Sequence, residues 1–371
     1  PFEGFLLDRG FQVLLAAYPE AKRTLDYRAL QLHSFYPGAL VRIGGKFHKV
    51  VDPWRHPVEA LKGAFSPVGT FGDKLKVRKL RRELRKGTVE EIFQRRETTA
   101  LEALRGRGFS PSLIDRFFRP FLGGVFFDRE LRVSSRMFEF GFRMFSSGDT
   151  ALPAQGMGAI PAQIASLLPA GSLRLNSRVD FIQERSVLLS SGEKMNAEAV
   201  VLATEGPETA RLLGEAWRQG SRSTTCVYFS ADEPPLDGPL LVLNGEGEGP
   251  VNSLAVPSLA APTYAPRGQC LIAATVIGLP PLTDEQLVGA VRSQLSGWFG
   301  PKVSAWRHLR TYWIRHALPG QAPPLADPTA PLPPPRPGLY VCGEYAYPAS
   351  LQWAMASGRK VGESVARALK R

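Results

Sequence analysis

Cysteine and histidine are scarce in this sequence. Its 371 residues include three cysteines, Cys226, Cys270 and Cys342, and five histidines. The cysteines are far apart and odd in number, which fits buried thiols or a reducing compartment such as a bacterial cytoplasm or a plastid stroma. The histidines form no H-x-E or H-x-x-x-H pair. No metal site is therefore predicted.

Long apolar runs and acidic residues are also under-represented. No run approaches the roughly 18–20 apolar residues that a membrane span requires. The 34 acidic residues are outnumbered by 46 Lys and Arg, and the net charge is +12. This balance favours anionic partners, namely nucleic acid, anionic lipid or an acidic protein. With 44% hydrophobic residues the chain is able to bury a sizeable core, and its length predicts two domains.

Positive charge is concentrated in the segment that begins at Lys74 and ends at Lys86. It holds eight basic residues and one acid. Val77, Leu80 and Leu84 recur at helical spacing, which predicts an amphipathic helix. Such a helix is suited to a peripheral contact with an anionic membrane, and the simpler interpretation is a solvated helix with its apolar stripe turned inward. Nucleic-acid binding is not predicted, because aromatic residues do not interleave with the basic ones.

The C-terminal part predicts a strand, a loop and a helix. An apolar run over residues 339–342 is typical of a buried strand, and Gly343 and Glu344 follow it directly. Nucleotide ligands bind at such carboxyl ends of strands in open α/β sheets, where glycine allows close approach. Small and apolar residues then recur at helical spacing: Ala354, Gly358, Val361, Val365 and Leu369.

This order of residues resembles the C-terminal flavin-binding motif of the FAD-dependent amine oxidase, protoporphyrinogen oxidase and phytoene desaturase superfamily. The resemblance implies that FAD is the cofactor and that Gly343 and Glu344 lie beside its ribityl and pyrophosphate part. It also implies that the backbone at Ala354 and Met355 offers N–H groups to the flavin pyrimidine carbonyl. Trp353 stands where the family usually has glycine. Without the resemblance, the segment is an ordinary strand–loop–helix unit of a core.

The N-terminal segment carries a second part of the resemblance. Residues 2–15 are similar to the family pattern G-h-x-h-D-x-G-x-Q-h, where h is hydrophobic. The match implies that Arg9, Gly10 and Phe11 approach the isoalloxazine ring. The family's G-x-G-x-x-G turn would lie roughly 50 residues upstream, and no such turn follows a predicted strand later in the sequence. Since the first residue is Pro1, we expect a fragment that begins inside the motif.

A third part of the resemblance covers residues 152–203. They predict a helix to about residue 168, a strand over 173–179, a meander and a strand over 199–203. This order is similar to the middle portion of the family's FAD domain, with its G-M-G, x-R-V and V-V-x-A-T signatures. The match implies that the backbone of Val179 contacts the adenine.

The remaining segments predict the substrate-binding part. Residues 114–145 are rich in phenylalanine and resemble the helical cap of the desaturase-like branch, where such residues line a tunnel for apolar substrates. Core packing is the alternative for each phenylalanine, and also for Tyr345, Tyr347 and Trp353, which are candidates to border the ring. Helices are predicted over 88–104 and after Ser110 and Thr283. Strands are predicted over 40–43 and 47–51, joined by a two-residue turn at Gly44 and Gly45, and over 225–229, 240–243, 270–276 and 306–313.

Together these features predict an α/β fold in which an FAD-binding Rossmann-like domain, lacking its N-terminal βαβ unit, is interleaved with a mixed-sheet substrate domain that bears a helical cap. The predicted FAD-domain segments are 1–11, 151–215 and 331–371. The predicted substrate-domain segments are 12–150, which includes the cap, and 216–330.

Lysine is absent from residues 195–300. Many amine oxidases of the family carry a lysine in the strand corresponding to 221–230, which reaches flavin N5 through water. The resemblance therefore favours hydride transfer to N5 from an apolar, isoprenoid or tetrapyrrole substrate, with oxygen, a quinone or another acceptor reoxidising the flavin. The cofactor carries out this redox step, so no catalytic acid or base is assigned. An amine oxidase, or a non-catalytic relative that binds a membrane surface or an acidic partner, stays as an alternative, and the oligomeric state is open.

Overall fold

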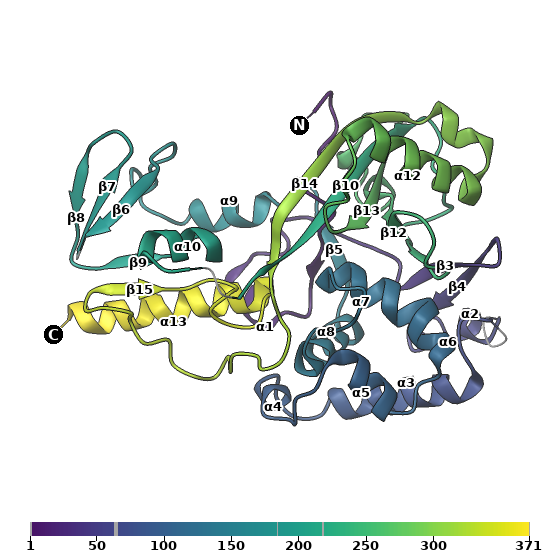
Figure 1. Ribbon diagram of the computed structural model, residues 1–371, viewed down its shortest axis with the longest axis horizontal. Coiled ribbons are helices and arrows are strands. Elements are labelled where there is room, and N and C mark those ends of the chain that lie inside the picture. Colours follow the sequence, from purple (N-terminus) through teal and green to yellow (C-terminus); the bar gives the residue numbers. More distant parts are fainter. Residues whose placement is uncertain (1, 63–65, 184, 217–218, 371) are drawn as a thin grey trace.

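The computed structural model describes residues 2–62, 66–183, 185–216 and 219–370. Figure 1 shows a large sheet with α12 at the upper right and a group of helices below it. Smaller sheets lie at the left with α10 and α13, and the long strands β10 and β14 connect the two sides. Most of the buried apolar side chains form one cluster that joins the helices to one face of the large sheet.

The large sheet has seven strands in the order β14-β10-β13-β12-β11-β3-β4. The β11–β3 pair is parallel and the other neighbouring pairs are antiparallel, so the sheet is mixed as predicted. Gly44 and Gly45, both at positive φ, form the predicted turn between β3 and β4. The strands are β3 (Gly38–Ile43), β4 (Lys46–Val51), β10 (Ser221–Ala231), β11 (Leu241–Asn244), β12 (Val251–Ala255), β13 (Cys270–Ile277) and β14 (Arg307–Pro319).

The two faces of this sheet pack against different parts of the chain, because side chains alternate between the faces along each strand. In β10, Val227 and Phe229 pack under α12 (Asp284–Phe299), whereas Cys226 and Tyr228 belong to the cluster on the opposite face. The second face therefore points toward the N-terminal segment and the cap. Short elements complete this region: α11 (Pro257–Ala260), η3 (Pro262–Tyr264) and η4 (Pro301–Ala305).

The helices below the sheet contain the segment that was assigned to the cap. A helix over 88–104 was predicted, and this prediction is wrong: α4 and α5 are separate. The first of these helices ends at Phe93. The second begins after Thr99, whose hydroxyl forms a capping box with the Glu102 carboxylate. The cap contains α2 (Pro57–Lys62), α3 (Phe71–Leu84), α4 (Glu90–Phe93), α5 (Ala100–Gly106), α6 (Pro111–Leu113), the π-helical turn η2 (Ile114–Phe118), α7 (Arg119–Phe126) and α8 (Ser135–Ser147).

The region at the left of Figure 1 holds the strands and helices assigned to the FAD domain. A parallel pair of strands, β9 and β15, lies above α13, beside an antiparallel β6-β7-β8 sheet. The predicted strand over 173–179 is wrong, because β6 begins only at Val179 and Asn176 has a φ of +54° that breaks an extended chain. The elements are β6 (Val179–Gln183), β7 (Ser186–Leu189), β8 (Lys194–Asn196), β9 (Val200–Leu202), α10 (Gly206–Leu213), β15 (Leu339–Val341) and α13 (Leu351–Leu369).

A three-stranded sheet and two helices connect these regions. The sheet has the order β1-β5-β2, and α1 packs against α13. The predicted helix after residue 152 begins later than expected, because the preceding residues pair as β5. These elements are β1 (Leu14–Leu15), α1 (Pro19–Thr24), β2 (Leu32–Ser34), β5 (Thr150–Pro153) and α9 (Ala159–Ala165).

Candidate functional site

Gly343 and Ala354 lie together at the carboxyl end of β15. The hydroxyl of Ser357, on α13, accepts the N–H of Gly343 at 3.0 Å and donates to the carbonyl of Ala354 at 2.8 Å. Gly343 has a φ of +146°, and a Cβ at this position would lie 2.8 Å from the ring of Tyr345. Glycine is therefore required here for both conformation and space.

Glu344 is a largely buried carboxyl group at the same turn. Burial, together with the neighbouring Glu205 carboxylate, raises its pKa to about 7. A group of this kind repels phosphate and suits neutral hydroxyls, to which it is able to donate or accept a hydrogen bond. Glu344 thus fits the hydroxyl-bearing ribityl part of FAD better than its pyrophosphate.

The N-terminus of α13 offers its free N–H groups one turn earlier than the resemblance implied. The Ser350 hydroxyl caps the helix by accepting the N–H of Trp353, and the N–H of Ala354 donates to the Ser350 carbonyl at 2.9 Å. The two N–H groups that precede these belong to Leu351 and Gln352. A flavin carbonyl at this helix end would meet those two residues rather than Ala354 and Met355.

Tyr347 and Trp353 are core residues. Both are almost fully buried, and the Tyr347 hydroxyl donates to the carbonyl of Ala330 at 2.6 Å. Trp353 packs edge-on against Phe93 at 5.3 Å and lies beside Phe140 of the cap. Of the alternatives for these two side chains, core packing is the one that the structure supports.

Val179 is connected to the β15 turn through α10. Its carbonyl accepts a hydrogen bond from Arg211 at 3.0 Å, and Arg211 lies on α10. Thr209, on the same helix, accepts the hydroxyl of Tyr345 at 2.9 Å. The C-terminal part of the resemblance and the part over residues 152–203 are therefore held by one helix.

Arg9, Gly10 and Phe11 lie toward the large sheet. Arg9 is exposed, whereas Gly10 is buried at a φ of +91°, with Ile314 of β14 only 2.7 Å from the site of a Cβ. Phe11 packs edge-on against Phe35 at 5.8 Å. Within the described ranges, no hydrogen bond joins these three residues to Val179 or Glu344. Their connection to α13 comes ten residues later, where the N–H of Glu20 donates to Gln352 at 2.8 Å.

A polar network holds the backbone that precedes Gly10. The Asp8 carboxylate accepts the hydroxyl of Tyr264 at 2.7 Å and the N–H of Met157 at 3.0 Å, and the Tyr228 hydroxyl donates to the Asp8 carbonyl at 3.1 Å. Burial raises the pKa of Asp8, and the two hydrogen bonds oppose that rise. Our sequence analysis did not assign a function to Asp8. The sequence feature that could have pointed to Asp8 is an acidic residue within an apolar run, because an acidic group needs hydrogen-bond partners when it is buried.

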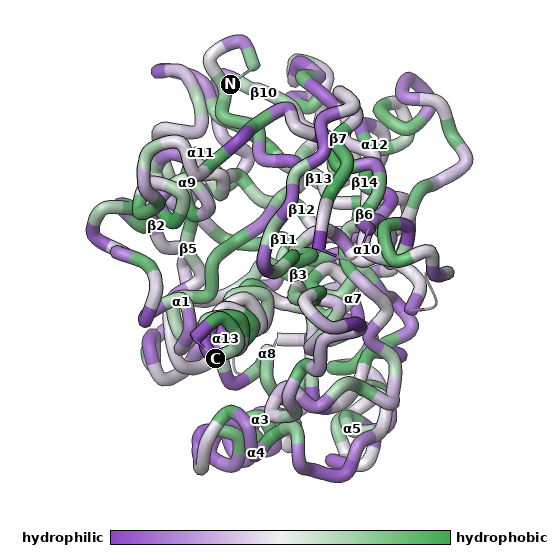
Figure 2. Tube along the Cα trace, turned by 90° about the vertical axis from the view of Figure 1, so that its left-hand side faces the viewer, coloured by the Kyte–Doolittle hydropathy of each residue, from purple (hydrophilic) through white to green (hydrophobic). Residues whose placement is uncertain are grey.

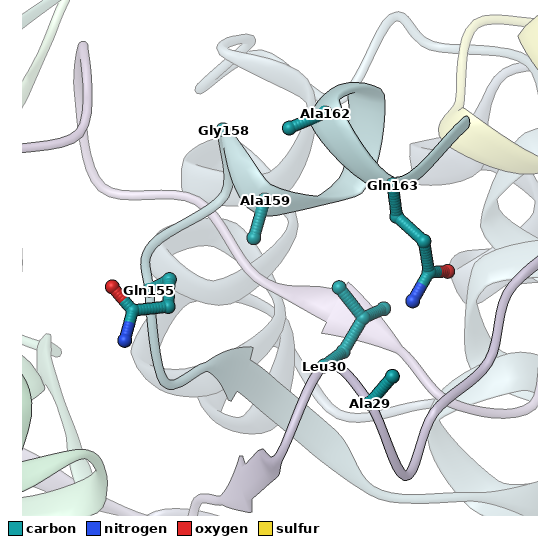
Figure 3. A pocket seen from close by; sticks show the side chains of 7 residues that line it. All are labelled: Ala29, Leu30, Gln155, Gly158, Ala159, Ala162 and Gln163. Carbon is teal, nitrogen blue, oxygen red and sulfur yellow. The ribbon is translucent and has the colours of Figure 1, made fainter. Parts of the chain in front are cut away.

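Surface hollows occur beside α9 and along β6 and β7. One, of about 470 Å³, lies between Leu30 and the start of α9, and Figure 3 shows Gln163 and Ala159 pointing into it. The other, of about 350 Å³, lies along β6, β7 and Lys194. Neither hollow is lined by the predicted site residues.

Comparison with protein families identifies the chain. Residues 1–366 match the model of the flavin-containing amine oxidoreductase family. The chain belongs to this family. It is an FAD-dependent oxidoreductase, and the predicted family, cofactor and enzyme class are confirmed. Comparison with curated proteins gives no match.

Solved structures of similar fold include oxidoreductases that are distant in sequence. An oxidoreductase from Methanosarcina mazei has a TM-score of 0.73 at 16% identity, over 98% of this chain and 90% of that one. Putrescine oxidase bound to putrescine has a TM-score of 0.64 at 12% sequence identity. Cyclohexylamine oxidase from Brevibacterium oxydans has a TM-score of 0.63 at 14% identity. Both matches cover 98% of this chain and 88% of the other. The flavin-containing amine oxidoreductase thus shares their α/β fold with a mixed sheet, as predicted.

Proposed function

We propose that this flavin-containing amine oxidoreductase removes a hydride from a carbon atom of an apolar substrate of the isoprenoid or tetrapyrrole class. The observation that carries the proposal is the set of side chains that β10 directs toward the N-terminal segment. Cys226 lies beside the backbone of Phe11, and Tyr228 reaches Asp8. Burial raises the pKa of Cys226 to about 12 and that of Tyr228 well above its ordinary value, so both groups are neutral.

Neutral side chains such as these suit a substrate that is oxidised at carbon and does not have to lose a proton from nitrogen. An amine substrate must be deprotonated before oxidation, and a neutral thiol and phenol are poor bases for that purpose. The lysine of the amine oxidase pattern has no counterpart among residues 195–300. These residues therefore favour carbon–hydrogen oxidation without an acid or base from β10.

The cap contributes apolar surface. Phe118, Phe138 and Phe140 are fully buried core residues, which is the simpler of the two interpretations of them. Others in the same segment are only half-buried and contact one another: Phe117 stacks on Phe121 at 5.5 Å, and Phe121 packs edge-on against Phe145 at 5.1 Å. A partly exposed aromatic cluster suits an apolar ligand.

FAD supplies the electron-accepting ring when it is bound. In this proposal Glu344 would bind the ribityl hydroxyls, and the first N–H groups of α13, on Leu351 and Gln352, would bind the pyrimidine carbonyl. The backbone of Val179 would contact the adenine, with Arg211 holding that strand in place. Arg9, Gly10 and Phe11 would hold the ring on the side of the sheet where Cys226 and Tyr228 lie.

Anaerobic reduction of the flavin tests the substrate class. The protein, with FAD added in excess, is mixed without oxygen with apolar isoprenoids or tetrapyrroles, and separately with putrescine or cyclohexylamine. Absorbance of oxidised flavin is followed at about 450 nm. We expect bleaching by a member of the apolar set. Bleaching by the amines alone would support the second candidate, an amine oxidase, which the fold likeness to putrescine oxidase and cyclohexylamine oxidase favours.

A further inference from the structure

The two faces of α3 differ completely in character. Its buried face contains Asp73, Val77, Leu80 and Leu84, at spacings of four, three and four residues, and this face packs against α8 and the core. This agrees with the inward apolar stripe predicted from the sequence. Figure 1 and Figure 2 both place α3 at the lower edge of the molecule, with its outer side away from the rest of the fold.

Large apolar residues occupy the N-terminal half of the outer face. Phe71 is 70% exposed and Leu75 is 54% exposed, one turn apart. Next to this helix, Trp54 is 41% exposed, and the guanidinium group of Arg81 lies over its ring at 4.1 Å. Transfer of apolar side chains of this size from water to an apolar environment is favourable. The outer face therefore begins with an apolar edge.

Basic residues occupy the C-terminal half of the same face and the residues after it. None of them makes an ion pair with any other residue in the part of the chain that the structure describes. Like charges spaced three or four residues apart repel one another along a helix, so this arrangement lowers helix stability unless an anionic surface is present. The exposed set is Arg78, Lys79, Arg82, Arg85 and Lys86.

The acidic residues of α3 do not offset this charge. Asp73 is buried and accepts hydrogen bonds from Thr70 and Ser110. Glu83 pairs with Arg107 at 2.9 Å and with Arg95 at 3.4 Å, on the side toward α5. Both carboxylates are thus used inside the cap, and the outer face keeps its full positive charge.

We propose that the outer face of α3 docks on an anionic lipid bilayer, with Phe71 and Leu75 inserted among the headgroups and the basic residues paired with lipid phosphates. A bilayer interface accepts apolar and cationic groups side by side, in the plane of one helix. A nucleic acid would pair with the basic residues and leave Phe71 and Leu75 exposed to water. None of the helices in the described part of the chain has the length and apolarity of a bilayer span, so this contact is peripheral.

Vesicle co-sedimentation of the full chain tests the proposal. We expect binding to vesicles of about 70% phosphatidylcholine and 30% phosphatidylserine, weak binding to phosphatidylcholine alone, and loss of binding at high salt. The double variant Arg78→Glu, Arg82→Glu should bind at least about tenfold more weakly. The variant Phe71→Ser, Leu75→Ser should bind more weakly while keeping the salt dependence.

A matched control variant distinguishes the effect of the outer face of α3 on binding from the effect of net charge. The double variant Arg267→Glu, Lys302→Glu changes the net charge by the same amount at exposed residues outside the cap, next to β13 and in η4. It should bind vesicles as the unmodified chain does. Thermal unfolding checks that each variant is folded. An equal loss in the control, binding that ignores lipid charge, or tight binding to duplex DNA or RNA with none to vesicles overturns the proposal. It does not depend on the substrate of the enzyme.

Discussion

The phenol of Tyr264 donates a hydrogen bond to the partly buried carboxylate of Asp8, 2.7 Å away, across 256 residues of sequence. This contact ties the segment that contains Arg9, Gly10 and Phe11 to the loop between β12 and β13. Met157 completes the arrangement by donating its N–H to the same carboxylate. The position of the N-terminal segment therefore depends on two distant parts of the chain.

Replacing Tyr264 with Phe should destabilise the fold and displace this segment. Removal of one donor leaves a buried carboxylate with the Met157 N–H, at a cost of about 1–3 kcal/mol in the free energy of unfolding. Tyr264 lowers the pKa of Asp8 by stabilising the ionised form, so the deficit should grow as pH rises and Asp8 ionises. Urea unfolding at several pH values measures it. Tyr312→Phe, which removes the hydroxyl of a half-buried tyrosine in β14, serves as the control, and an equal deficit in both would contradict the assignment.

Glu344 should make stability depend on pH near neutrality. Its pKa is about 7 in the folded chain against an ordinary 4.5, so the folded state binds the proton more tightly. Its contribution is most favourable below about pH 4.5 and is lost as pH rises through 7. Without FAD, Glu344→Gln should be more stable than the unmodified chain at pH 8 by about 2 kcal/mol, with little difference near pH 5. Urea midpoints measured at both pH values decide this, and Glu363→Gln, which loses an exposed pair with Arg359, should show no such gain.

Gly343 should not tolerate a side chain. Gly343→Ala places a Cβ 2.8 Å from the Tyr345 ring at a φ of +146°, which should cost roughly 1–3 kcal/mol and reduce FAD retention. Gly358→Ala is the matched control. It lies in α13 with nothing within 4 Å of the added atom, and it should stabilise the helix by about 1 kcal/mol. Differential scanning calorimetry compares the two, and equal melting temperatures would count against a required glycine at residue 343.

The 371-residue chain should hold FAD weakly by itself. Its sequence contains no glycine-rich turn between a strand and a helix to bind the pyrophosphate with backbone N–H groups. The ratio of flavin absorbance to protein after gel filtration measures retention. Stoichiometric FAD in that experiment would show that other residues bind the pyrophosphate.

Phe121 and Phe138 should respond differently to truncation. Phe138→Ala removes a fully buried ring and should cost about 3–5 kcal/mol of stability. Phe121→Ala, at a half-buried ring, should cost less and instead raise the KM for the apolar compound that bleaches the flavin. Steady-state kinetics together with urea unfolding separate the two effects. An unchanged KM for Phe121→Ala would remove this cluster from the substrate path.

Local patterns in the sequence were sufficient for the elements whose signals lie within a few residues. The capping box at Thr283, the Gly44–Gly45 turn and the apolar stripe of α3 depend on contacts between near neighbours. The same local reasoning failed at 88–104 and 173–179. There a periodic apolar pattern was interrupted by a cap and by a left-handed asparagine, which the pattern alone does not reveal.

The amino-acid sequence by itself determined the family, the flavin cofactor and most strands and helices, since motif order and side-chain periodicity are properties of contiguous residues. Only the tertiary structure decided which groups meet. It made Tyr347 and Trp353 core residues, joined Asp8 to Tyr264, placed the largely buried Glu344 near the Glu205 carboxylate, and turned Phe71 and Leu75 outward. These outcomes depend on how separate elements pack, and desolvation and exposure exist only once that packing has formed.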